Sequence, residues 1–140
     1  MNTYNINDAS FINTDAYKTF MNNNPSRGNL RIRAYAASGA IPISNLKITV
    51  RTKINNDNII FYEGVTNESG IIDRIILPAP KLNPDNLAAP ATTTYEVVAT
   101  YSPNESTNVY KVNIYENVYV IQTINIVPEM RIMRSDIKWQ

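Results

Sequence analysis

A polar turn between two apolar runs lies at the centre of the 140-residue chain. Residues 59–65 and 71–77 are rich in β-branched and aromatic residues, which favour strands, and residues 67–70 read Asn-Glu-Ser-Gly, a typical turn composition. Pro78 and Pro80 end the second run, because proline cannot donate a hydrogen bond to a neighbouring strand. The segment therefore predicts a β-hairpin, and a chain organised around it is limited to folds built mainly from strands.

Alternation of apolar and polar residues, the pattern of half-buried strands, recurs on both sides of this hairpin. It is present in residues 30–36, 46–51 and 95–101, and the runs 109–115 and 118–127 bring the predicted strands to seven. Such strands bury one face against another layer, so we expect an all-β fold, a seven-stranded antiparallel Greek-key β-sandwich with an N-terminal extension. Its expected core contains Leu30, Ile32, Leu46, Ile48, Val50, Val97 and Ile124.

The predicted sandwich spans residues 29–128, between an N-terminal extension, 1–28, and a C-terminal tail, 129–140. The extension lacks strand alternation but contains a possible two-turn helix, which Asn13 or Thr14 would cap. The tail mixes apolar and charged residues and fits either a helix turn or a final edge strand.

The extension carries more large apolar side chains than a solvated tail holds, so it needs a surface to pack against. It either folds back on its own sandwich or acts as an assembly arm that links neighbouring subunits head to tail. The candidate assembly-arm residues are Tyr4, Ile6, Phe11, Ile12, Tyr17, Phe20 and Met21.

The chain has no cysteine and no histidine, and its net charge is +1. The missing cysteine excludes disulfides and a thiol nucleophile, and the missing histidine removes the commonest general base and transition-metal ligand. The carboxylates are scattered. Their one local group, Glu63, Glu68 and Asp73, is too spread out for a calcium site, which needs about six oxygen ligands in a compact loop. We therefore expect no enzyme activity, no cofactor and no metal site.

Several basic residues are predicted to line the outward face of adjacent strands, with Tyr35 among them. They are Arg31, Arg33, Lys47, Arg51 and Lys53. Such a stripe fits nucleic-acid binding, or else the charged residues that keep an exposed sheet from pairing edge to edge. With a net charge of +1 we favour the second interpretation and expect no nucleic-acid partner.

Five tyrosines in or beside the later strands allow two interpretations. Together they would make a sugar-stacking platform, although tyrosine at strand spacing is more often a half-buried sheet residue whose hydroxyl reaches water. These tyrosines are Tyr95, Tyr101, Tyr110, Tyr115 and Tyr119.

Three segments in order resemble the carboxypeptidase regulatory-like domain, which is itself similar to transthyretin-type and collagen-adhesin B-type sandwiches. They are a proline-containing turn that enters a strand (40–50), a T-x-x-x-G turn (64–70) and a tyrosine-bearing strand after a loop (94–101). Many collagen-adhesin modules carry an internal Lys–Asn isopeptide bond. The resemblance would assign it to Lys47 and Asn125, but Lys47 lies on the polar side of its strand.

A narrower resemblance covers the Leu-Pro-Ala-Pro block at 77–80 and residues 112–128, which end in I-Q-x-hydrophobic-N-x-x-P. These segments are similar to the non-catalytic domain found with spore cortex-lytic enzymes and other spore-associated proteins of endospore-forming bacteria. The resemblance implies a module of the spore or cell surface, not a catalyst.

From these observations we expect a non-enzymatic structural subunit that self-associates into a spore-surface or cell-surface filament or layer, linked by its N-terminal arm. Its partners would be itself and other spore or cell-surface proteins. The alternative is a surface binding module that docks to glycan, to peptidoglycan or to a separate spore cortex-lytic enzyme.

The start of the sequence, residues 1–8, has neither a charged nor an apolar signal region, and no apolar run approaches the ~20 residues of a membrane helix. We therefore expect a protein made in the cytoplasm that reaches the spore or cell surface without a classical signal peptide and without membrane insertion.

Overall fold

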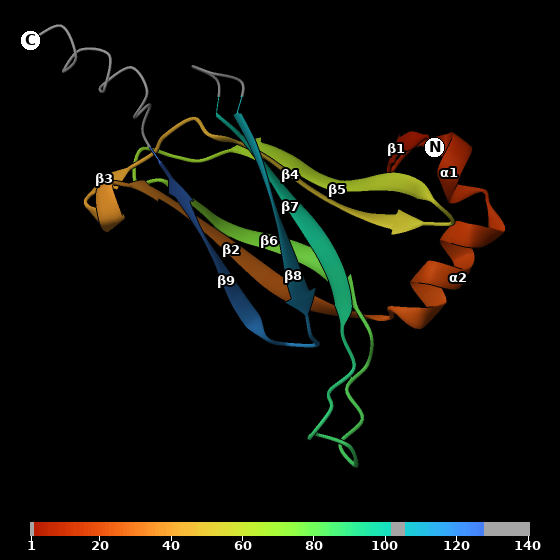
Figure 1. Ribbon diagram of the computed structural model, residues 1–140. Helices are drawn as coiled ribbons and strands as arrows, with labels where there is room; N and C mark the ends of the chain where they lie inside the picture. The colour runs from red at the N-terminus through yellow and green to blue at the C-terminus, as the bar shows by residue number, and fades with distance from the viewer. Residues whose placement is uncertain (1, 102–105, 128–140) are drawn as a thin grey trace, which may run out of the picture.

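The computed structural model describes residues 2–101 and 106–127, which form two facing β-sheets (Figure 1). The five-stranded sheet has the order β1 (Thr3–Asn5), β5 (Asp57–Val65), β4 (Lys47–Ile54), β7 (Thr93–Tyr101), β8 (Ser106–Ile114). The four-stranded sheet contains β2 (Ser26–Ala36), β3 (Ile41–Pro42), β6 (Ile71–Ala79) and β9 (Tyr119–Ile126). Asn29, Leu30, Ile32 and Arg33 of β2 each pair with both β6 and β9, so these two strands lie along opposite edges of β2.

The expected all-β sandwich is confirmed, but its finer description is not. The described residues contain nine strands rather than seven, because the count of seven did not include the short strands β1 and β3. The arrangement is also not wholly antiparallel, since β1 runs parallel to β5 and β9 runs parallel to β2. The Greek-key connection is not confirmed. Side-chain alternation reports which face a residue occupies, and it carries no information on strand direction.

The predicted central hairpin is wrong, although its turn is correct. Asn67 accepts hydrogen bonds from the backbone N–H groups of Ser69 (2.9 Å) and Ile71 (3.0 Å), and Gly70 takes a positive φ of 75°. The strands on either side do not pair with each other, however, because β5 belongs to the five-stranded sheet and β6 to the four-stranded sheet. The turn is therefore a corner that carries the chain from one sheet to the other.

A single buried threonine fixes this corner. Thr66 is 1% exposed, and its hydroxyl accepts a hydrogen bond from the N–H of Leu46 (3.0 Å) and donates one to the carbonyl of Ile43 (2.6 Å). The corner is thus tied to the segment that leads into β4, which satisfies polar groups that would otherwise be buried without a partner.

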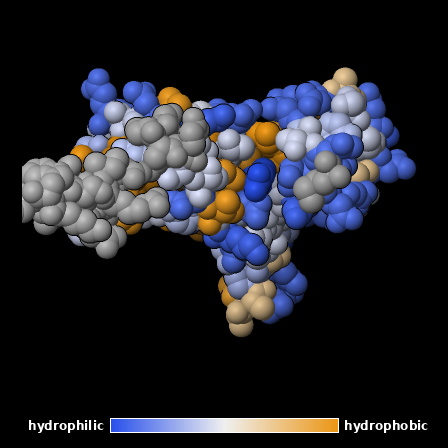
Figure 2. All heavy atoms as spheres, turned by 45° about the horizontal axis from the view of Figure 1, so that its top comes forward, coloured by the Kyte–Doolittle hydropathy of each residue, from blue (hydrophilic) through white to orange (hydrophobic). Residues whose placement is uncertain are grey.

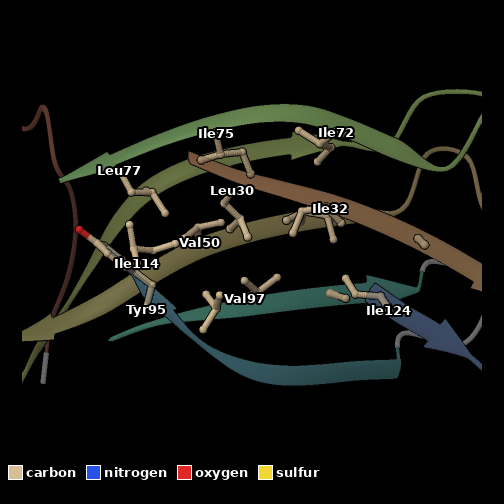
Figure 3. Packing of buried hydrophobic residues seen from close by; sticks show 14 of the residues in the cluster. Leu30, Ile32, Val50, Ile72, Ile75, Leu77, Tyr95, Val97, Ile114 and Ile124 are labelled. Atoms are coloured by element: carbon tan, nitrogen blue, oxygen red, sulfur yellow. The ribbon is translucent and has the colours of Figure 1, made fainter. Parts of the chain in front are cut away.

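All seven predicted core residues are confirmed, each with at most 2% of its surface exposed. Their side chains meet between the two sheets, as Figure 3 shows for Leu30, Ile32 and Val97. Burial of an aliphatic side chain of this size stabilises a fold by roughly 1.5–3 kcal/mol. The layer between the sheets is therefore the main source of stability.

Tyr95 is a core residue and not a sugar platform. It is fully buried, its ring meets Phe61 edge to face at 5.2 Å, and its hydroxyl donates a hydrogen bond to the carbonyl of Pro78 (2.6 Å). Burial raises the pKa of Tyr95, so the phenol stays neutral and remains a donor.

The N-terminal segment forms β1 and two helices, α1 (Ala9–Ile12) and α2 (Asp15–Asn23), beside the turn between β4 and β5 (Figure 1). The expected helix cap is confirmed at Thr14, whose side chain accepts a hydrogen bond from the N–H of Tyr17 (3.2 Å). None of the helices in the described residues is long and apolar enough to cross a membrane.

Most of the candidate assembly-arm residues contact the chain's own sheet. Phe11 is 4% exposed and forms a cluster with Ile54 and Ile59, around which Tyr4 and Tyr17 pack. The remaining members are less central: Ile6 and Phe20 are half-buried in the same cluster, Met21 is half-buried, and Ile12 is 36% exposed.

A long loop, residues 80–92, connects β6 to β7 and projects from the sandwich (Figure 1). Its tip carries apolar side chains, including Leu87, which is 64% exposed. In Figure 2 the end of the protrusion has the tan and orange colours of hydrophobic residues. At its base the Glu116 carboxylate accepts hydrogen bonds from the Ser26 hydroxyl (2.6 Å) and the Leu82 N–H (2.9 Å). The predicted tail, 129–140, lies outside the described residues.

Replacing Phe11 with alanine should release the N-terminal segment from the five-stranded sheet. A Phe→Ala change at a buried site costs roughly 3–5 kcal/mol. The change should appear as faster hydrogen exchange at the Ile6 N–H, which donates to the Ile60 carbonyl (2.8 Å). The matched control is I12A, because Ile12 is far more exposed and its loss should leave this exchange nearly unchanged. Equal effects of the two changes would contradict the packing described.

The base of the loop should loosen in acid. The hydrogen bonds from Ser26 and Leu82 hold the pKa of Glu116 below its usual value of 4.5. Because the folded-state pKa is lowered, the stabilisation by this anchor is present above about pH 4.5 and is lost as the pH falls through the folded-state pKa. We expect the NMR shift of the Leu82 amide to titrate with a midpoint below 4.5.

The variant E116Q should remove this titration, whereas E68Q, on the exposed corner, should preserve it. A midpoint at or above 4.5 for the Leu82 amide in the unmodified protein would show that the anchor is not ionised as described.

Candidate functional site

The outer face of the four-stranded sheet collects side chains that point away from the core. On β2 the even-numbered residues from Gly28 to Ala36 are buried, so the odd-numbered residues face solvent. The parallel register places Arg31 beside Ile121 and Arg33 beside Thr123, and the exposed side chains of β9 extend the same face.

A β-bulge in β6 adds a further cation to this face. Leu30 pairs with Ile75 and Ile32 pairs with Ile72, so two residues of β6, Asp73 and Arg74, lie opposite Arg31. Both of these residues are exposed. In a regular strand two consecutive side chains point to opposite faces, and the bulge is what keeps both on the outside.

Short-range contacts hold these side chains together. Arg31 forms an ion pair with Asp73 (2.5 Å), and the Tyr119 hydroxyl reaches across the sheet to donate a hydrogen bond to the Asp73 carbonyl. The guanidinium of Arg74 lies over the Tyr119 ring, 5.8 Å from its centroid. The guanidinium of Arg33 lies 5.1 Å from the centroid of Tyr35. We call the surface formed by Arg31, Arg33, Tyr35, Asp73, Arg74 and Tyr119 the arginine–tyrosine face.

The arginine–tyrosine face has an excess of positive charge, with three guanidinium groups and one carboxylate. The described part of the chain contains two side-chain ion pairs, Arg31–Asp73 and Arg51–Glu96. Arg33 and Arg74 therefore have no carboxylate partner among the described residues. Each of these guanidinium groups lies over an aromatic ring, which attracts a cation without neutralising its charge.

The predicted basic stripe is wrong as a single surface. Arg31 and Arg33 lie on β2, whereas Lys47, Arg51 and Lys53 lie on β4, in the other sheet. The two groups therefore occupy opposite outer faces of the sandwich. Sequence reasoning also missed Arg74 and Tyr119 as members of the face. A bulge at Asp73–Arg74 has no local signal other than two consecutive polar residues in an apolar strand.

The isopeptide bond implied by the collagen-adhesin resemblance does not fit the structure. Lys47 is exposed on β4 of the five-stranded sheet, and Asn125 is exposed on β9 of the four-stranded sheet. The two side chains point away from the common core on separate sheets, so they do not meet.

The other sequence candidates are dispersed as well. Glu63 lies on β5, Glu68 on the corner and Asp73 on the arginine–tyrosine face, and in residues 2–101 and 106–127 no three Asp, Glu, His or Cys residues gather as a metal group. The five tyrosines do not form one platform either, since Tyr95 is in the core and Tyr119 is on the outer face of the other sheet.

Comparison with known proteins gives similarity to solved structures only. No family model matches the sequence, and no curated protein matches it. The 5-hydroxyisourate hydrolase of Klebsiella pneumoniae superposes with a TM-score of 0.48 and 17% identity over 72% of this chain and 90% of that chain. An (S)-allantoin synthase gives a TM-score of 0.49 and 15% identity over 74% of this chain and 41% of that chain. These likenesses concern the fold, and no catalytic residue is carried over from them.

The expected filament or surface-layer subunit is corrected at this point. The similar structures are named as enzymes, a hydrolase and a synthase, and neither is named as a filament or spore protein. In addition, the apolar residues of the proposed arm are packed against the chain's own β4 and β5. The sequence showed that these side chains need a surface to pack on, but it could not show whose surface that is.

Proposed function

We propose that the chain is a recognition module that binds a carboxylate-bearing polysaccharide through the arginine–tyrosine face. The observation that carries the proposal is that Arg33 and Arg74 are held in place by aromatic rings without a carboxylate partner in the described residues. A guanidinium that is positioned but not neutralised is suited to an external anion.

The chemistry of the face favours carboxylate groups on a polymer. Arginine presents a planar fork of donors that matches a carboxylate in a bidentate arrangement. The rings of Tyr119, which is exposed, and Tyr35, which is half-buried, offer apolar surface beside these forks, which suits the apolar faces of sugar rings. The face lies on the outer side of a sheet, a surface along which an extended ligand can lie.

Two other classes of function fit this surface less well. Nucleic-acid binding proteins carry a strong basic excess, whereas this chain has a net charge of +1. General acid–base catalysis uses a positioned acid and base, and the arginine–tyrosine face offers a single carboxylate, Asp73, which is paired with Arg31. The proposal is therefore for binding.

The proposal predicts weak, salt-sensitive binding of polygalacturonate oligomers. R33A and R74A should each lower the affinity roughly two- to fivefold, because an exposed ion pair contributes about 0.2–1 kcal/mol. Each should also reduce the dependence of affinity on salt concentration. The measurement is isothermal titration calorimetry at two or three ionic strengths.

K47A is the matched control, because Lys47 is an exposed cation on the opposite outer face of the sandwich. Its affinity should stay at the level of the unmodified protein. If K47A weakens binding as much as R33A, or if the unmodified protein binds no polygalacturonate at low salt, the arginine–tyrosine face is not the binding surface. Tighter binding of single-stranded DNA than of polygalacturonate would also overturn the proposal.

A further inference from the structure

A cavity of about 430 Å³ lies where the ends of β7, β8 and β9 come together. Its walls include Tyr101 from β7, Asn108 and Tyr110 from β8, and Asn125 and Ile126 from β9. The volume is within the range of small-molecule sites, about 300–1,000 Å³. The cavity borders the packed core, since Ile126 belongs to the core and Tyr101 and Tyr110 pack against it, but its two asparagines are exposed.

The lining of this cavity is polar but uncharged. None of its described lining residues is acidic or basic. The side-chain amides of Asn108 and Asn125 are exposed and make no hydrogen bond within the described residues, so each offers a free donor and a free acceptor. Partial burial raises the pKa of Tyr110, which keeps its hydroxyl neutral.

This set of groups matches a particular ligand chemistry. Amides both donate and accept, as hydroxyl groups require, while phenol rings and Ile126 supply apolar surface for the C–H face of a ring. A charged ligand would gain no opposite charge here, and a purely apolar ligand would leave the amides desolvated without partners. A neutral, hydroxyl-rich ring satisfies both parts of the lining.

We propose that the cavity is a binding site for a neutral saccharide unit. Asn108 from β8 and Asn125 from β9 bind its hydroxyl groups, and Tyr110 packs against its ring. The site does not require the arginine–tyrosine face, since the two have no residue in common. They are adjacent, however, because Asn125 is the register partner of Tyr35, the last aromatic residue of that face.

The test is an NMR titration of the full chain with three neutral trisaccharides: cellotriose, maltotriose and the N-acetylglucosamine trimer. At least one should shift the backbone amides of residues 106–110 and 125–127 in a saturable manner. N108A and N125A should each weaken that binding roughly three- to tenfold, as expected for the loss of hydrogen bonds to a neutral ligand. Y110F, which keeps the ring, should weaken it less than Y110A.

The matched control is T123A, an exposed position on β9 that does not line the cavity. Thermal unfolding of N108A, N125A and T123A should remain near that of the unmodified protein, because these three residues are exposed. N108A should also leave polygalacturonate binding unchanged, which separates this proposal from the previous one. Absence of saturable shifts at these amides with every trisaccharide, or equal binding by N108A and T123A, would overturn it.

Discussion

Strand β2 is paired along both edges, and the rest of the structure depends on this arrangement. With β9 on one side and β6 on the other, its backbone groups are satisfied by neighbouring strands and its side chains have two possible directions. The even-numbered residues enter the core, where Leu30, Ile32 and Ala34 are fully buried. The odd-numbered residues must then face outward, which places Arg31 and Arg33 side by side on one surface. The core and the candidate site are therefore two consequences of one pairing.

The sequence predicted those features that depend on local pattern alone. The burial of Val50 or Ile124 follows from a period of two, and the Thr14 cap follows from hydrogen-bond chemistry within one turn. The corner after Thr66 could not be predicted in the same way, because the same Asn-to-Gly turn serves a hairpin and a corner equally well. What decides between them is the bonding of the Thr66 hydroxyl to the segment before β4, which is a long-range contact.

The candidate site also depends on long-range contacts that a local sequence pattern cannot predict. Arg31, Arg33 and Tyr35 could be placed on one outward face from their spacing within a single strand. Arg74 joins them because β6 contains a bulge, and Tyr119 joins them because β9 crosses to the other sheet and runs parallel to β2. Neither the bulge in β6 nor the parallel pairing of β9 leaves a distinctive local pattern in the sequence. The arginine–tyrosine face is consequently a property of the topology, and its members come from three strands that are distant in sequence.

The near-neutral net charge conceals a local excess of positive charge on the arginine–tyrosine face. On the five-stranded sheet Arg51 is paired with Glu96 on the neighbouring strand, and Glu63 on β5 contributes a further negative charge beside the lysines of β4. On the four-stranded sheet one aspartate faces three arginines. An anion near the second face meets guanidinium groups that aromatic rings have already positioned, so little side-chain entropy is lost when it binds. Beyond Tyr35 and Asn125, which are register partners, lies the cavity, and its described lining residues carry no charge. If both proposed sites bind one polymer along β2, the face would take an acidic part of it and the cavity a neutral part, because the guanidinium groups lie on the face.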